Sequence, residues 1–251
     1  MKKSLLGCAI LAATIVAPVQ ADTLLGAYVG AQAWNMGVEG GFSNDESLTN
    51  FSFDDKTNGS FYVALEHPLP LVPNVKIIRT TLDTAGVTTL ATSFEFNGEL
   101  YSANTDLTTD FEMTATDFIL YYEILDNDLV SIDVGINGKY IDGIIMVQES
   151  SGNRMVSEEF SGVIPMGYAR AEVGLPFTGL GLVAEGSFLA IGDHTVSDFQ
   201  AALTYSFVET LALDMTLQAG YRAMNVELDD VDDIFADLEF SGVFVGLEFD
   251  F

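Results

Sequence analysis

Hydrophobic and polar residues alternate strictly along the last thirteen residues of the chain, Glu239 to Phe251. Successive side chains of a β-strand point to opposite faces, so this stretch has one apolar face and one face of mainly small and acidic residues. The apolar face consists of Val243, Val245, Leu247, Phe249 and Phe251. An apolar row that runs to the terminal carboxylate needs a partner sheet or lipid, and we interpret it as the closing strand of a barrel.

The same alternation recurs along the chain and predicts ten strands of about nine to twelve residues, the length of tilted membrane-spanning strands. The predicted strands cover 23–34, 59–67, 75–83, 117–124, 130–139, 168–175, 182–190, 198–207, 213–222 and 239–251. The strand at 75–83 is the least regular, because Lys76 and Arg79 have opposite parity and one of them should lie at an interface. Eight or twelve strands are the alternatives to ten.

Polar and acidic stretches separate these strands and predict long connections at 35–58, 84–113, 143–162 and 228–237. Asn97 and Gly98 predict a type I′ hairpin, which either projects beyond the membrane or adds a strand pair. The alternate connections are mostly shorter, as in PFTG at 176–179. An even strand number places both termini on one side, and this asymmetry is typical of outer-membrane barrels with periplasmic termini.

The N-terminus has the pattern of a secretory signal peptide, with Lys2 and Lys3, an apolar run from Leu5 to Ala17 and a small-residue end at Ala21. We therefore divide the chain into a signal peptide, 1–21, and an outer-membrane barrel domain, 22–251. The only cysteine, Cys8, falls within the signal peptide, so we expect no disulfide or thiol chemistry in the mature protein. Most of the apolar run follows Cys8, which argues against lipidation there.

The chain contains 37 acidic and 9 basic residues, with a net charge of −28, which argues against nucleic acid as a partner. Yet 49% of the residues are hydrophobic, so charged and apolar residues must be segregated by face. After the signal peptide, no apolar run reaches the roughly 18 residues that a spanning helix requires. A closed barrel is the remaining way to cross a bilayer. The sequence thus predicts an all-β, transmembrane, antiparallel up-and-down barrel.

The ending VFVGLEFDF, with its terminal Phe251, resembles the closing strand that the barrel-assembly machinery recognises in Gram-negative outer-membrane proteins. Together with ADTLLGAYVGAQAWNM and YYEILDNDLVSIDVGINGKYIDG, it is similar to a proteobacterial family of outer-membrane barrel proteins that is mostly uncharacterised. The resemblance implies an outer-membrane location, with lipid, lipopolysaccharide, the assembly machinery and periplasmic chaperones as partners. It supplies no catalytic residues. We expect a monomer.

Charged residues with inward parity predict an ion-pair network in the lumen, formed by Asp133, Lys139, Arg170, Glu172, Glu185, Asp214 and Arg222. Side chains already fill barrels of about eight strands, whereas water-filled porins have about sixteen. We therefore expect a largely plugged lumen and a structural role, with a narrow small-solute pore as the alternative.

Candidate chemistry outside the lumen is sparse, and we assign no catalytic residue. Asp193 and His194 in an acidic outer loop leave open a surface enzyme, omptin-like or lipid-modifying, or an adhesin. Asp229, Asp230, Asp232 and Asp233 supply oxygen ligands that suit Ca²⁺ or Mg²⁺, with a solvated loop as the alternative. No other cofactor is expected. Aromatic residues near strand ends are candidates for interface girdles, namely Trp34, Tyr121, Tyr122, Tyr140, Tyr168, Phe207, Tyr221, Phe249 and Phe251, although Tyr121 and Tyr168 have inward parity.

Overall fold

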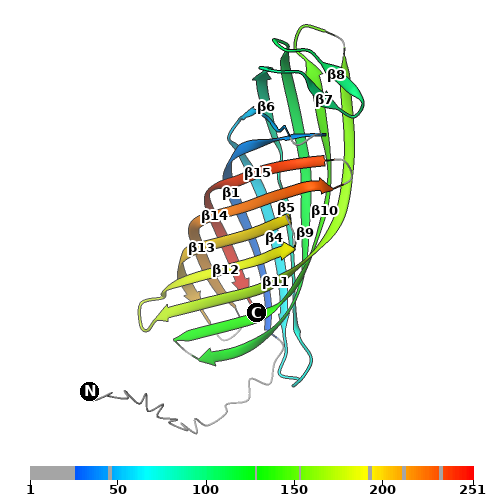
Figure 1. Ribbon diagram of the computed structural model, residues 1–251. Coiled ribbons are helices and arrows are strands. Elements are labelled where there is room, and N and C mark those ends of the chain that lie inside the picture. Colours follow the sequence, from blue (N-terminus) through cyan, green and yellow to red (C-terminus); the bar gives the residue numbers. More distant parts are fainter. Residues whose placement is uncertain are drawn as a thin grey trace, which may run out of the picture.

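A computed structural model describes residues 26–44, 47–127, 129–152, 154–191, 194–210, 213–231 and 234–251. Within these ranges, ten antiparallel strands form a closed up-and-down barrel, in which β15 pairs with both β14 and β1 (Figure 1). The barrel strands are β1 (Gly26–Ser43), β4 (Lys56–Glu66), β5 (Asn74–Thr81), β9 (Asp106–Asn127), β10 (Val130–Glu149), β11 (Met155–Leu175), β12 (Leu180–Ile191), β13 (His194–Glu209), β14 (Asp214–Val231) and β15 (Ile234–Asp250). The predicted fold is confirmed with ten strands rather than eight or twelve. The predicted signal peptide lies outside the described residues.

Five short strands complete the architecture: β2 (Thr49–Asn50), β3 (Ser52–Phe53), β6 (Thr84–Thr89), β7 (Phe94–Phe96) and β8 (Glu99–Tyr101). β6 continues the path of β5 along β9 after a break at Leu82 and Asp83. β7 and β8 form a separate two-stranded sheet. Its turn residues Asn97 and Gly98 both have positive φ, 46° and 73°, so the predicted type I′ hairpin is confirmed.

The two ends of the barrel differ. The C-terminus lies at one end with the turns that join β4 to β5, β9 to β10 and β11 to β12, and we name this the terminal end (Figure 1). The β7–β8 hairpin covers the opposite end, which we name the hairpin end. In the part of the chain that the structure describes, no helix is long and apolar enough to span a membrane.

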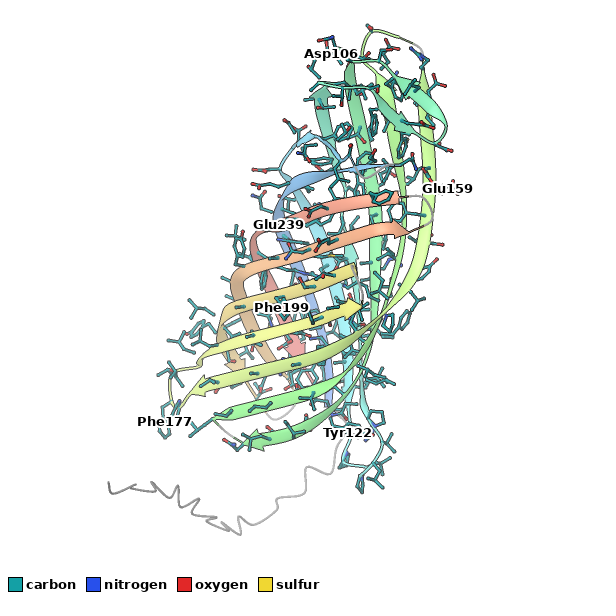
Figure 2. All side chains as sticks on the ribbon, in the orientation of Figure 1. Asp106, Tyr122, Glu159, Phe177, Phe199 and Glu239 are labelled. Carbon is teal, nitrogen blue, oxygen red and sulfur yellow. The ribbon has the colours of Figure 1, made fainter. Side chains whose placement is uncertain are left out.

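Along β9, the side-chain parity stays constant from Leu107 to Tyr121 while the polarity of the two faces inverts. In the half of β9 near the terminal end, Phe118 and Leu120 point outward, whereas Asp117 is buried inside the barrel. In the other half, Phe111 and Met113 are buried inside, and Glu112 points outward. The residues labelled in Figure 2 follow the same division, with the aromatic Tyr122, Phe177 and Phe199 nearer the terminal end than the acidic Asp106, Glu159 and Glu239. One strand therefore serves two environments.

This inversion explains why much of the predicted loop structure is wrong. β1 continues to Ser43, β9 begins at Asp106, β10 reaches Glu149 and β11 begins at Met155. β14 and β15 likewise extend through most of 228–237. The outward residues of these extensions are mostly polar or Gly, which is typical of loops, with Met155 and Val163 among the exceptions. Most of the apolar residues between them are inward and form a core.

This core lies inside the hairpin end. The Phe42 ring stacks on Phe51 with centroids 5.0 Å apart and meets Phe96 of the hairpin edge-on at 5.4 Å. Phe94 and Tyr101 of the hairpin are also fully buried. The hairpin is therefore packed onto the barrel as a cover.

Trp34 belongs to the same core and is 1% exposed, so its predicted place in an interface girdle is wrong. Its even position in β1 points into the barrel, as do Tyr121 and Tyr168. The predicted girdle residues that lie exposed on the outer surface are Tyr122, Tyr140, Phe207, Tyr221 and Phe251.

Candidate functional site: the barrel interior

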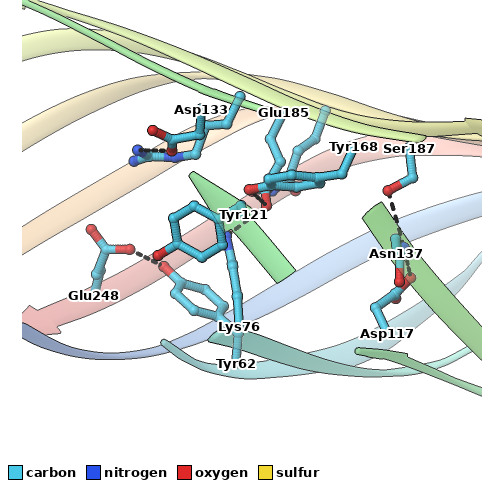
Figure 3. Close-up of polar contacts among 12 residues, drawn as sticks. Tyr62, Lys76, Asp117, Tyr121, Asp133, Asn137, Tyr168, Glu185, Ser187 and Glu248 are labelled. Atoms are coloured by element: carbon cyan, nitrogen blue, oxygen red, sulfur yellow. Dashed lines mark hydrogen bonds and ion pairs between the residues drawn. The ribbon is translucent and has the colours of Figure 1, made fainter. Parts of the chain in front are cut away.

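Halfway along the barrel, a fully buried lysine bridges a carboxylate of the adjacent strand and a carboxylate across the lumen. Lys139 Nζ of β10 lies 2.7 Å from Asp117 Oδ1 of β9 and 2.9 Å from Asp198 Oδ2 of β13. Asn137 donates to Asp117 Oδ1 at 2.6 Å and to Ser187 Oγ at 3.0 Å (Figure 3). Asp117 lies directly opposite Lys139 in the β9–β10 ladder, whereas the contacts to Asp198 and Ser187 join strands that are not paired and cross the lumen.

Arg222 of β14 completes this layer from the remaining side of the wall. Its Nε and Nη2 donate to the two oxygens of Asp198 at 2.9 and 2.7 Å, a bidentate geometry that holds both groups in place. Its Nη1 donates to Thr80 Oγ1 at 3.3 Å, and its guanidinium lies 4.9 Å from the Trp34 ring centroid. Lys139, Asp117, Asp198 and Arg222 together are named the central layer below.

A second set of contacts lies next to the central layer on its terminal side. Lys76 Nζ is 2.6 Å from Glu185 Oε1, and the Tyr168 hydroxyl donates to the same oxygen at 2.8 Å (Figure 3). Gln200 donates to the other oxygen of Glu185 at 3.1 Å. Tyr62, whose ring lies 4.9 Å from Lys76 Nζ, donates to Glu248 Oε2 at 2.6 Å. The charges are thus paired and hydrogen-bonded, as burial in a narrow lumen demands.

At the terminal end the interior widens into a polar vestibule of about 320 Å³. Arg170 lies there between Asp133, at 3.6 Å, and Glu172, with which it forms a close ion pair. Tyr121 donates to Glu66 Oε1 at 2.7 Å in the same wall. Beyond it, the cavity bounded by the central layer and Glu185 shrinks to about 30 Å³, roughly the share of liquid volume of one water molecule.

The predicted lumen residues therefore lie in two places. Lys139, Glu185 and Arg222 lie at or beside the central layer, whereas Asp133, Arg170 and Glu172 line the vestibule. Asp214 also faces the vestibule, and its Oδ1 accepts a hydrogen bond from the Thr210 amide.

The predicted network leaves out three charged members: Lys76, Asp117 and Asp198. Parity alone places Asp117 and Asp198 inside the barrel, but it does not show that they join the network. For Lys76, the competing parity of Arg79 left the orientation open, and the structure places Arg79 outside with Nη1 on Thr116 Oγ1 at 3.2 Å.

The other candidate sites are only partly visible. The side chains of Asp229, Asp230, Asp232 and Asp233, and those of Asp193 and His194, lie outside the described residues. His67 lies in the turn after β4, where Nε2 is 3.2 Å from the Pro73 carbonyl oxygen. Among the described side chains, no group of three or more His, Cys, Asp or Glu is arranged to hold a metal ion.

No protein-family model and no curated protein matches this chain. Solved structures with a similar course of the chain include the transport unit of the autotransporter AIDA-I from Escherichia coli, with 8% identity, 96% of this chain and 94% of that chain covered, and a TM-score of 0.42. The outer membrane protease OmpT from Escherichia coli gives 9% identity, 90% and 96% coverage, and a TM-score of 0.49. A FadL homologue from Pseudomonas aeruginosa is 8% identical, with 90% of this chain and 90% of that chain covered and a TM-score of 0.33. These likenesses supply no argument about activity or location.

Proposed function

We propose that the chain is an integral outer-membrane barrel with a structural role, whose lumen is closed to solutes. The central layer carries this proposal, because it joins β9, β10, β13 and β14 across the lumen through ion pairs of 2.7 to 2.9 Å. A solute would have to break these pairs and leave buried charges uncompensated, which is costly. The apolar core at the hairpin end obstructs the lumen a second time, on the far side of the central layer.

Two observations support the membrane location. The outward side chains of the terminal half are apolar, and Phe61, Phe118, Leu203 and Val245 are each more than half exposed. An outward apolar band of this kind is characteristic of transmembrane barrels. Among the described residues of that half, the closed ladder leaves no strand edge, so their backbone polar groups are satisfied within the wall.

We further propose that both termini lie in the periplasm, because the hairpin half presents a polar outer surface suited to the outside of the cell. Outer-membrane lipid and lipopolysaccharide would surround the apolar band, and the barrel-assembly machinery and periplasmic chaperones would handle the unfolded chain. The acidic segment 228–237 would bind Ca²⁺ or Mg²⁺ between the barrel and lipopolysaccharide phosphates. The barrel would act as a monomer.

Planar-bilayer conductance tests the closed lumen. We expect the reconstituted protein to give no channels under conditions in which a sixteen-stranded porin conducts. Insertion should be verified in the same sample by migration on gels before and after heating. Reproducible channels with cation preference would overturn the closure and favour the narrow small-solute pore.

A further inference from the structure

A second large interior space lies at the hairpin end and has a different character from the vestibule. It has a volume of about 330 Å³, within the size range of small-molecule sites. Aromatic and aliphatic side chains from six strands line it, including Phe111, Ile145, Phe160, Met224, Leu238 and Phe240. This apolar pocket plays no part in the ion-pair network.

The pocket reaches the outside through a gap in the barrel wall. β11 pairs with β10 from Met155 onward, but with β12 only over Gly167–Leu175. Among the described strand pairings, 155–166 therefore has no partner on its second edge. Inward Phe160 and outward Val163 both line the pocket, and Val163 is 67% exposed, so the space passes beside this edge.

The lining restricts the chemistry of an occupant. Glu158 and Glu159 are the charged groups among the described lining residues, and both are acidic. Their field disfavours a carboxylate or phosphate in the pocket. Apolar walls reward the burial of hydrocarbon surface at about 25 cal/mol per Å².

We propose that this pocket binds an uncharged, hydrocarbon-like small molecule that enters beside 155–166. The site is independent of the proposed closure of the lumen, because it lies on the hairpin side of the central layer. Gly162 lies on the gap edge, and a Cβ built there meets no atom within 4 Å. A larger side chain at Gly162 therefore enters the space without displacing the wall.

Trp34 provides a direct readout, because it is the only tryptophan and shares a buried cluster with Met224 and Phe240 of the pocket. Bromine quenches tryptophan fluorescence at short range. We expect 1-bromooctane, added to the folded full-length barrel in detergent, to quench Trp34 saturably. As a control, a brominated alkyl maltoside, which stays in the micelle, should leave most of the Trp34 fluorescence unquenched.

Gly162→Leu should weaken the saturable quenching, because its side chain takes up part of the pocket. Gly138→Leu is the matched control, since its Cβ also meets nothing within 4 Å but its position in β10 faces outward. Ala236→Leu, on the opposite wall, repeats the test if Gly162→Leu does not fold. Absence of quenching in the unmodified protein overturns the proposal, as does equal quenching in Gly138→Leu and the folded pocket-filling variant.

Discussion

Lysine and arginine are scarce in this chain, and most of them point into the barrel. Two of the nine belong to the predicted signal peptide, which leaves 9 − 2 = 7. Four of those seven, Lys76, Lys139, Arg170 and Arg222, form ion pairs with interior carboxylates. The cations are thus concentrated where they neutralise buried acids rather than on the outer surface.

Asp198 is the residue whose loss should be most damaging, because it serves both Lys139 and Arg222. We expect Asp198→Ala to lower the free energy of unfolding by about 3 to 5 kcal/mol, since it leaves two buried cations without this partner. Urea unfolding of protein folded into lipid vesicles measures the loss.

Glu99→Gln is the control, because Glu99 pairs with Arg154 at 2.7 Å on the exposed surface of the hairpin end. Exposed pairs contribute little to stability. If Asp198→Ala and Glu99→Gln unfold at the same urea concentration, the central layer does not stabilise the barrel as we describe.

The sequence predicts which of these side chains point inward, but not which of them meet. Parity within one strand places Lys139 and Arg222 on the interior face. That both of them meet Asp198 follows only from the registers of the strand pairs between β10 and β14 together with the closure of the barrel, which brings β10 and β13 face to face. Hydrophobic alternation is a local signal, so it carries no information on cross-lumen contacts.

At the scale of elements, the closing strand β15 separates the two faces most clearly. Val245 points outward and is 61% exposed, whereas Glu248 points inward and accepts a hydrogen bond from Tyr62. We expect Val245→Lys to cost about 2 to 4 kcal/mol near the centre of the apolar band. Glu248→Lys should be milder for insertion. The two variants are compared by their unfolding in lipid vesicles and by the amount of protein inserted into the membrane. A greater loss of insertion in Glu248→Lys than in Val245→Lys would contradict the assigned faces.

The end of β15 supports a separate prediction about assembly. The Phe251 amide donates to the Ala27 carbonyl at 3.0 Å, and its ring is 59% exposed. An interfacial ring of this size contributes at most about 1.5 to 3 kcal/mol, while the rest of the ladder stays intact. Deletion of Phe251 should therefore reduce the amount of barrel in the outer membrane more than it reduces the stability of folded protein. Normal membrane levels would show that Phe251 is not an assembly signal.

The existence of the barrel strands could be predicted from the sequence, but their length could not. Alternation with apolar residues outside identified nearly every barrel strand in its terminal half. In NMGVEGGF of β1 and VSEEFSG of β11, the same alternation continues with apolar residues inside. Glycine and acidic residues in these segments mimic loops, and only the core formed with the hairpin shows why they are strands.

At the scale of the whole molecule, the inversion of polarity divides the barrel into a terminal half and a hairpin half, and the long strands run through both. The terminal half is polar inside and apolar outside, as a lipid-embedded barrel must be. The hairpin half is apolar inside and polar outside, as in a water-soluble β-protein. The central layer lies where the interior changes from one character to the other.

The environment of outward positions along β9 tests this division most directly. Single cysteines at Leu120, Phe118, Glu112 and Asp110, in a chain that lacks Cys8, can carry a bimane fluorophore in lipid vesicles. We predict that lipid-borne quenchers reach the labels at Leu120 and Phe118, and that aqueous iodide reaches those at Glu112 and Asp110. Iodide quenching at all four positions, or lipid quenching at all four, would contradict the account.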